Sequence, residues 1–536
     1  MKPRPSRRDL ITGAAALAAY SQIGDVRAQT ARKLLLAEKA TATVIPPPAA
    51  TYLPTVGSSP IAVFGVRKMV SSYSGPLLQV LRASDNATMD VAQLGNGLPN
   101  LAAVVSWAAG SATTVSKWYD QVNSNHATNA VVASQPIFDA SGQYGVYNAF
   151  NSFKAIVMDG WVDISNNNNP KYLMIPTSLS FNRNNYTIVY AFEPTYGCYN
   201  ELYSELINGA SAYVQHSTAQ STSGIGATGG TTVYSGRRPR QMYQTLGMTG
   251  SASNYTFFQD GQIIAAAAKS SVAILGATLG YSVTPSPTFF AKDNHLALIY
   301  YPAALSSADM ASVQAAINAT FGLPTSTGTG SQVVAVGDSI LASASPSAST
   351  QNRSTIRGTR PYLKSSVSGL YNFGIPSQTL ALLIANSATR EFLLATDGTY
   401  TTRVLVIQIA SADLDNNGGT AGYGATLYSS MSSYITNARA AGYTKIVLNT
   451  LLPRSNNANW NVQTTQYWTE MNSYNSLVRA NSAGADAICD LANAPLMGVY
   501  ANTFNTTYYQ DNLHPTGYGY TLLAPLYVAA INSVLP

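Results

Sequence analysis

The sequence predicts two domains: a β-sandwich followed by an α/β domain with a parallel sheet. Between residues 58 and 322, short apolar runs alternate with clusters of Gly, Asn and Ser, which is typical of antiparallel strands joined by tight turns. Between 332 and 536, continuous apolar strands alternate with amphipathic helices, a pattern typical of a parallel sheet covered on both faces. The segment 323–331, "LPTSTGTGS", is rich in turn formers and is predicted to link the two domains.

The composition argues against a nucleic-acid-binding protein. Only 10% of the 536 residues are charged, whereas 46% are hydrophobic and 34 are tyrosines. Because soluble proteins usually carry about 25% charged residues, solubility here rests on neutral polar groups. Such a surface suits hydroxyl-rich partners such as polysaccharides or oligosaccharides and is unsuited to nucleic acid.

The first 28 residues, "MKPRPSRRDLITGAAALAAYSQIGDVRA", place the pair Arg7-Arg8 before a short apolar run that ends near small residues. This arrangement resembles a twin-arginine signal peptide and implies a periplasmic or secreted protein; a disordered N-terminus is the alternative. No stretch approaches twenty apolar residues, so no membrane span is expected. Residues 29–57 contain a proline cluster and are predicted to be a linker.

Within 58–322, the strongest strand predictions are "YTIVYAFEP", "NYTFFQDGQIIAAA" and "HLALIYY". Asp260 and Gly261 separate two apolar stretches and predict a hairpin, because Gly readily takes the positive φ of such turns. After the last strand, Ser306 or Ser307 is expected to cap a helix that ends near Gly322. A β-sandwich closed by one helix follows.

The hairpin "FFQDGQ", the strand "LALIYYPAALSSADM" and the closing helix resemble the concanavalin A-like or laminin G-like jelly roll. Upstream, "GVRKMVSSYSGPLLQVLRASDNATMD" and "KWYDQVNSNHATNA" are similar to the start of the arabinofuranosidase B catalytic domain, which belongs to that sandwich class. The resemblance implies glycan binding. The catalytic carboxylate segments of that family have no match, and Glu201 and Glu205 are the nearest acidic pair.

Several other residues are interpreted as structural. Three tryptophans and three histidines are expected in the core or in hydrogen-bonded turns: Trp107, Trp118, Trp161, His126, His216 and His295. Cys198 and Cys489 lie in different predicted domains, so no disulfide is expected. No Cys and His cluster has zinc-ligand spacing, and we therefore expect neither a metal nor another cofactor.

In the second region, "VVAVGDSILA" places Ser339 directly after a buried strand, where sites of parallel sheets lie. Ser339 is either a nucleophile or the start of a helix. A nucleophilic serine needs a base, and His514, in "YQDNLHPTGYGY", is the one histidine between 332 and 536. Asp511 precedes it by three residues, within reach of the imidazole. The alternative is a solvated turn with Thr516 capping the last helix.

The "GDS" motif and the "D-x-x-H-P" motif before the final helix resemble the SGNH hydrolase family, also called GDSL esterases. That resemblance implies an α/β three-layer flavodoxin-like fold. It also implies a catalytic triad in which Ser339 is the nucleophile, His514 the base and Asp511 its orienting acid. The backbone N–H groups of Ser339 and Gly374 are expected to form the oxyanion hole.

One block of that family pattern differs. Where the family has "G-x-N-D", this chain has "IASADL", with Ala410 in place of Gly and Ala412 in place of Asn. The Asn side chain is an oxyanion donor in the family, and losing one such donor typically lowers the rate about 100- to 1000-fold. Ser411, Asn416 or Asn417 are the alternative donors if the loop "ADLDNNGG" folds back.

The leading hypothesis is an exported carbohydrate esterase that removes acyl groups from a polysaccharide or oligosaccharide while the sandwich domain holds the glycan. A glycan-binding protein with a degenerate esterase domain is one alternative. An arabinofuranosidase-like glycosidase acting through the N-terminal domain is another.

Replacing Arg7-Arg8 with Lys-Lys should retain the full-length protein in the cytoplasm, because twin-arginine export depends on the arginine pair. Cell fractionation followed by immunoblotting measures the result. The control replaces Arg27, outside the pair, with Lys and should leave export unchanged. Equal export of the double-lysine variant and the wild type would contradict the assignment.

Overall fold

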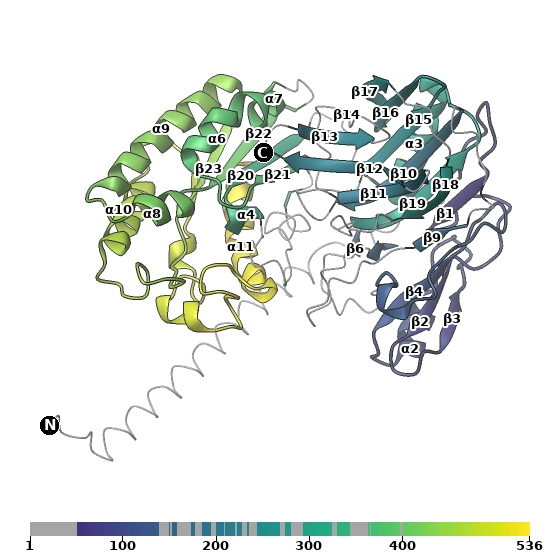
Figure 1. Ribbon diagram of the computed structural model, residues 1–536, viewed down its shortest axis with the longest axis horizontal. Helices are drawn as coiled ribbons and strands as arrows, with labels where there is room; N and C mark the ends of the chain where they lie inside the picture. Colours follow the sequence, from purple (N-terminus) through teal and green to yellow (C-terminus); the bar gives the residue numbers. More distant parts are fainter. Residues whose placement is uncertain are drawn as a thin grey trace, which may run out of the picture. The chain divides into compact units, whose positions relative to one another are not determined.

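The computed structural model describes most of the chain beyond residue 50; the described residues are 51–138, 185–194, 244–268, 293–323, 330–342, 363–364, 366–396 and 400–536, with shorter segments between 149 and 279. Within them, antiparallel sheets come first and a parallel sheet with helices follows (Figure 1). The predicted order of a β-rich and an α/β domain is confirmed. The predicted export signal, residues 1–28, lies outside the described residues.

The described part of the N-terminal domain contains two large antiparallel sheets. The first has the order β1-β19-β10-β15-β16-β17, with β8 on β19: β1 (Ala62–Gly65), β8 (Ile156–Val157), β10 (Tyr186–Pro194), β15 (Gln244–Gly250), β16 (Asn254–Gln259), β17 (Gln262–Ala268) and β19 (Asp293–Tyr301). The second has the order β14-β13-β12-β11-β18-β9-β5-β4-β2-β3: β2 (Leu78–Arg82), β3 (Thr88–Val91), β4 (Thr113–Trp118), β5 (Ala127–Thr128), β9 (Leu173–Ile175), β11 (Asn200–Ile207), β12 (Ala210–Ala219), β13 (Thr222–Ala227), β14 (Val233–Tyr234) and β18 (Ile274–Leu279). The remaining elements are α2 (Leu101–Ala108), η1 (Val132–Ser134), the pair β6 (Ala149–Phe150) and β7 (Phe153–Lys154), and α3 (Ser307–Phe321).

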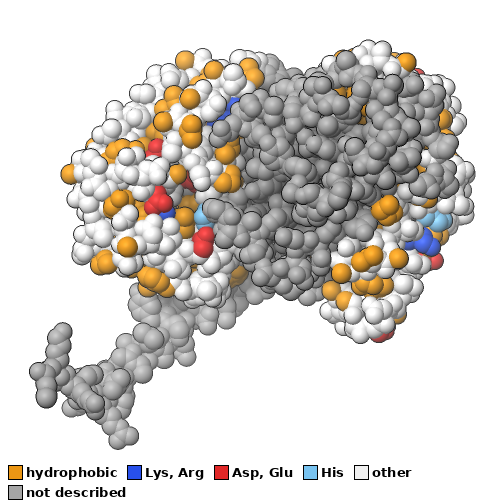
Figure 2. All heavy atoms as spheres, viewed as in Figure 1, with side chains coloured by type: hydrophobic (Ala, Val, Ile, Leu, Met, Phe, Trp, Pro, Cys, Tyr) orange, Lys and Arg blue, Asp and Glu red, His pale blue; other side chains and the backbone are white. Residues whose placement is uncertain are grey.

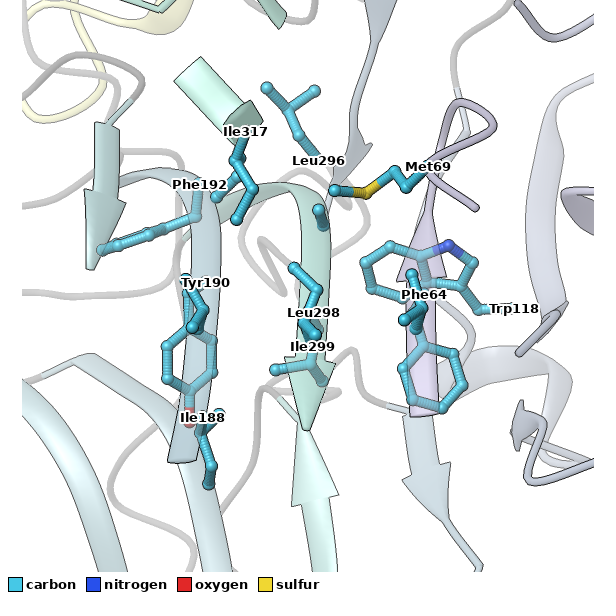
Figure 3. Close-up of a cluster of buried hydrophobic side chains, with 14 of the residues drawn as sticks. Phe64, Met69, Trp118, Ile188, Tyr190, Phe192, Leu296, Leu298, Ile299 and Ile317 are labelled. Carbon is cyan, nitrogen blue, oxygen red and sulfur yellow. The ribbon is translucent and has the colours of Figure 1, made fainter. Parts of the chain in front are cut away.

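Side chains from both sheets and from α3 form one hydrophobic core (Figure 3). Successive residues of β10 and β19 are buried, so both faces of these central strands are covered. Phe64 of β1 and Trp118 of β4 have ring centroids 5.7 Å apart, so the two sheets meet in the same core. Ile317 of α3 is fully buried among these residues. The helix therefore closes the core.

The predicted hairpin and helix cap are both confirmed. Asp260 and Gly261 join β16 to β17 with φ values of 49° and 85°, the positive values of a two-residue hairpin turn. The Gly261 N–H donates to Gln314 Oε1 of α3 at 2.6 Å, which ties the turn to the helix. Ser306 caps α3 through its side-chain oxygen, and Gly322 ends the helix with a left-handed conformation.

The last part of the predicted linker 29–57 packs on the β-rich domain. The Leu53 N–H donates to the Met69 carbonyl at 3.0 Å, and the Thr320 hydroxyl donates to the Thr51 carbonyl. Residues 51–57 therefore belong to this domain, because their backbone groups form hydrogen bonds with it. The proline-rich sequence does not predict these bonds.

The C-terminal domain is built on a parallel sheet with the order β21-β20-β22-β23-β24 in the described residues: β20 (Ser331–Gly337), β21 (Val367–Gly374), β22 (Thr402–Gln408), β23 (Lys445–Asn449) and β24 (Ala487–Cys489). Its helices are α4 (Ser339–Ala342), α6 (Leu380–Asn386), η4 (Ser387–Thr389), α7 (Glu391–Ala395), α8 (Ser411–Asn417), α9 (Tyr423–Ala441), α10 (Gln466–Ala480), η5 (Leu491–Asn493), η6 (Tyr500–Phe504) and α11 (Gly517–Val534). The helical segment after β21 is divided into α6, η4 and α7. Ser387 Oγ there donates to the Ile384 carbonyl and competes with regular helix bonding.

Both faces of the parallel sheet are covered. Val334 and Val336 of β20 pack with α6, α9 and α10, whereas Val333 and Ala335 pack with α4 and α11. This arrangement explains the continuous apolar runs, because successive side chains of a strand point to opposite faces. None of the helices in the described ranges is long and apolar enough to cross a membrane. On the described surface in Figure 2, charged side chains are sparse, in keeping with the composition.

Replacing Gly261 with Ala should destabilise the protein by about 2 kcal/mol. Part of the loss comes from the positive φ, and part comes from the new Cβ, which would lie 3.1 Å from Ala311 Cα. Gly110→Ala is the matched control, because Gly110 has the same φ of 85° but no atom near its Cβ position. Urea denaturation should show the smaller loss, about 1 kcal/mol, for the control. Equal losses would contradict close packing of this hairpin on α3.

Candidate active site

The turn after β20 sets the position of Ser339. A Cβ at Gly337 would lie 2.1 Å from the Gln408 carbonyl oxygen of β22, so a residue with a side chain would force the two strands apart. Asp338 forms the bend, and Ser339 begins α4. Ser339 is therefore both the start of a helix and a partly buried hydroxyl at the carboxyl end of the central strands.

The structure brings Ser339, His514 and Asp511 together in a hydrogen-bonded chain, called here the Ser-His-Asp chain. His514 Nε2 lies 2.8 Å from Ser339 Oγ, and His514 Nδ1 lies 2.7 Å from Asp511 Oδ2. The imidazole is only 3% exposed. Because a carboxylate accepts the Nδ1 proton, the neutral imidazole turns its Nε2 lone pair toward the serine hydroxyl.

Asp511 is suited to remain ionised beside the imidazole. Burial raises the pKa of its carboxyl group, but hydrogen bonds from the His514 ring and backbone lower it more, so the pKa lies below its ordinary value. The His514 N–H also donates to Asp511 Oδ1 at 2.7 Å. An ionised carboxylate in this place holds the ring and would stabilise an imidazolium.

The loop that carries His514 is held at several points. The Ser455 N–H donates to the Asn512 carbonyl at 2.9 Å, and the Gln510 N–H donates to the His514 carbonyl at 2.9 Å. Thr516 caps α11 by accepting the Gly519 N–H, as the alternative interpretation of this stretch expected. The stretch is therefore a helix-capping turn and also the support of the histidine.

The N–H group of Gly374, a predicted oxyanion donor, has another hydrogen-bond partner in the structure. The Gly374 N–H donates to Asn372 Oδ1 at 2.7 Å, and β21 continues through this buried glycine. The chain turns only at Ser377, which is exposed and has a φ of 61°. Within the described part of the chain, the N–H groups of Ser339 and Ser377 have no acceptor. Ser377 therefore replaces Gly374 as the candidate second donor.

The segment that departs from the family pattern folds as a short helix. Ala410 has a φ of 99°, a conformation that favours glycine, and α8 starts at the next residue. Asn416 and Asn417 are exposed at the far end of α8 from Ser411, and Asn417 donates to the Tyr423 hydroxyl. Of the three alternative donors, only Ser411 lies directly at the end of β22.

Two buried ionisable residues beside the Ser-His-Asp chain, Asp338 and Arg454, were not predicted from the sequence. Asp338 accepts the N–H groups of Ile340 and Ser411 at 3.0 and 3.3 Å. Burial raises the pKa of Asp338 to about 6, against these hydrogen bonds. Burial lowers the pKa of Arg454, whereas the Asp415 carboxylate opposes that shift. The "GDS" motif contains Asp338 and could have indicated it, whereas no local sequence pattern indicates Arg454.

The N-terminal candidates have mostly structural surroundings. Trp118 is fully buried, the Arg82 guanidinium lies over the Trp107 ring, and His126 Nδ1 accepts the Asp120 N–H. His295 is buried and its ring stacks on Phe192. Several other candidates lie outside the described residues, or only their backbone is described: Trp161, Cys198, Glu201, Glu205 and His216.

Among the described residues, no group of three or more His, Cys, Asp or Glu side chains is arranged to hold a metal ion. Cys489 is buried and unpaired.

Two known families match parts of the chain. Residues 333–526 match the GDSL-like lipase/acylhydrolase family. The C-terminal domain is called the GDSL domain below after this match, which supports a hydrolase. Residues 55–160 match the catalytic domain of α-L-arabinofuranosidase B, which shows that the N-terminal domain, called the arabinofuranosidase-like domain below, has carbohydrate-active relatives.

Individual relatives match over parts of the chain. A probable α-L-arabinofuranosidase B of Aspergillus fumigatus is 47% identical over 66 residues, 12% of this chain and 13% of the relative. An α-L-arabinofuranosidase of Hypocrea jecorina is 42% identical over 65 residues, with the same coverage. This chain therefore matches about an eighth of the length of these curated relatives.

Solved structures are similar to each domain. A GH54 α-L-arabinofuranosidase has a TM-score of 0.40 at 17% identity and covers 49% of this chain and 63% of its own. A putative acylhydrolase from Bacteroides fragilis has a TM-score of 0.29 at 22% identity and covers 38% of this chain and 88% of its own.

The raised pKa of Asp338 gives a pH-dependent expectation. Its folded-state pKa of about 6 exceeds the value near 3.9 of an unfolded chain, so the folded protein holds a proton that the unfolded chain releases between these values. The contribution of Asp338 to stability therefore falls as the pH rises from about 4 to 6. Relative to Asp338→Asn, the wild type should lose up to about 3 kcal/mol of unfolding free energy across this window. A difference that is constant with pH would contradict a buried, titrating Asp338.

Proposed function

We propose that this protein is an exported carbohydrate esterase, in which the GDSL domain removes acyl groups from a polysaccharide or oligosaccharide. The observation that supports this most directly is the Ser-His-Asp chain, with its two contacts of 2.8 and 2.7 Å. A serine, an imidazole and a carboxylate in this order can activate the hydroxyl as a nucleophile without a metal.

The proposed reaction begins when Ser339 Oγ attacks the carbonyl carbon of the ester. The Oγ–C bond forms as the hydroxyl proton passes to His514 Nε2, and Asp511 stabilises the imidazolium that results. The negative charge gathers on the former carbonyl oxygen, where the N–H groups of Ser339 and Ser377 are available to donate. The imidazolium then gives its proton to the sugar oxygen as the ester C–O bond breaks.

Water completes the proposed cycle. His514 takes a proton from the water as its oxygen attacks the acyl carbon, and a second oxyanion forms in the same place. When that intermediate collapses, the C–Oγ bond breaks, Ser339 recovers its proton from His514, and the free acid leaves. Each proton passes through Nε2, which the contact between Asp511 and Nδ1 keeps directed at the serine.

The arabinofuranosidase-like domain is proposed to hold the glycan. Its family match supports a carbohydrate ligand, and arabinofuranosyl-containing polysaccharides are the natural first class to examine. Attaching a glycan-binding domain to an esterase raises the local concentration of ester groups without new contacts at the site. Export is the third part of the proposal, and the low charge of the chain suits an extracytoplasmic setting.

Activity toward a chromogenic acetyl ester tests the proposal. Ser339→Ala and His514→Ala should each lower kcat at least about 1000-fold, and the double variant should lose little more, because the two residues act as a unit. Asp511→Asn should lower kcat between about 100- and 10,000-fold without unfolding the domain, because it disturbs only the imidazole.

The control is Ser433→Ala on the exposed side of α9, which should retain full activity. A wild type inactive toward small acyl esters and acetylated polysaccharide would contradict the esterase. Glycan binding without turnover would then favour the binding protein, and release of arabinose from an aryl arabinofuranoside would favour the glycosidase.

A further inference from the structure

The end of β22 lies beside the nucleophile turn. Gly337 of β20 pairs with Gln408 of β22 in parallel register. Ser339 lies two residues after Gly337, and Ser411 lies three residues after Gln408. The Ser411 N–H donates to Asp338 Oδ2 at 3.3 Å, and Asp338 directly precedes the nucleophile. Ser411 is thus fixed at the same edge of the sheet as the proposed oxyanion donors.

Arg454 holds Ser411 from the other side. Its Nη1 donates to both the carbonyl oxygen and Oγ of Ser411, each at 3.1 Å. The rest of the guanidinium is also engaged: Nη2 pairs with Asp415 at 3.1 Å, and Nε donates to Asn456 at 2.8 Å. The group lies over the Trp460 ring at 4.7 Å. With 3% of its side chain exposed, Arg454 is held in one position.

These contacts decide what the Ser411 hydroxyl can do. A serine hydroxyl has one proton to donate and two lone pairs. One lone pair accepts from Arg454, so the proton must point away from the guanidinium, and no described residue accepts it. A hydrogen bond from a cation polarises the O–H group and makes it a stronger donor. Ser411 is nearly buried, with 9% of its surface exposed.

We propose that the Ser411 hydroxyl, oriented and polarised by Arg454, donates to the oxyanion in place of the asparagine side chain that Ala412 lacks. Ser411 is then a catalytic residue and Arg454 is a positioning residue. The inference rests on the proposed esterase function. It explains how a site without the amide donor keeps a third group directed at the developing charge, in a partly buried place where such a contact matters most.

Steady-state kinetics on a chromogenic acetyl ester provide the test. Ser411→Ala should lower kcat about 10- to 100-fold with little change in KM, because the contact forms only as charge develops. Ser331→Ala is the matched control. Ser331 is a buried serine at the start of β20, the end opposite to the nucleophile turn, so this variant should retain wild-type kcat.

A rescue experiment distinguishes the loss of a hydrogen-bond donor in Ser411→Ala from a change in packing. Ala412→Asn should raise kcat at least about tenfold in the Ser411→Ala background by restoring an amide donor, yet change the wild type less than about twofold. Arg454→Lys should lower kcat in the wild type but have little further effect in Ser411→Ala, because its influence passes through Ser411. The second comparison uses only variants that retain the wild-type melting temperature and circular dichroism.

The outcomes distinguish the two proposals. A wild type without ester hydrolysis contradicts the esterase itself. If the wild type is active but the Ser411→Ala variant keeps kcat within twofold, or changes only in KM, the Ser411 donor is contradicted. The esterase proposal is then unaffected. Failure of Ala412→Asn to rescue a slow Ser411→Ala variant also contradicts the donor role.

Discussion

The site depends on the way β20 lies between β21 and β22 at its carboxyl end. Gly337 pairs with Gly374 on one side and with Gln408 on the other, and its missing side chain allows the β22 carbonyl to approach. Three turns therefore leave the sheet at one edge, and they carry Ser339, Ser377 and Ser411. The common position of these three turns follows from this packing.

Buried charge connects these turns in a protein with few charges. Asp338 links the nucleophile turn to α8, and Arg454 links α8 to the segment after β23. Glu391, fully buried, pairs with Arg390 and accepts from Tyr434 elsewhere in the same domain. Burying a charge is costly unless it is paired or hydrogen-bonded, so each of these groups tightly restricts its surroundings. The surface can remain neutral while the interior near the site is strongly polar.

Much of this structure was predictable because it depends on local patterns. The order of the domains, the hairpin at Asp260 and the cap at Ser306 follow from strand period, turn residues and helix capping. The approach of His514 to Ser339 followed from two motifs and the order of parallel strands. The competing contact of the predicted donor Gly374 was not predictable, because sequence does not show where β21 ends: Asn372 accepts the glycine N–H, and the turn falls on a serine. Arg454 was invisible for a similar reason, since its importance arises only from burial.

The central claim is that Ser339 is a nucleophile activated by His514, and labelling with a fluorophosphonate tests it most directly. The account predicts one label on each wild-type chain, located at Ser339 by peptide mass spectrometry, and labelling at least about 1000-fold slower in His514→Ala. Absence of label at Ser339, or equal labelling rates in the wild type and His514→Ala, would contradict it.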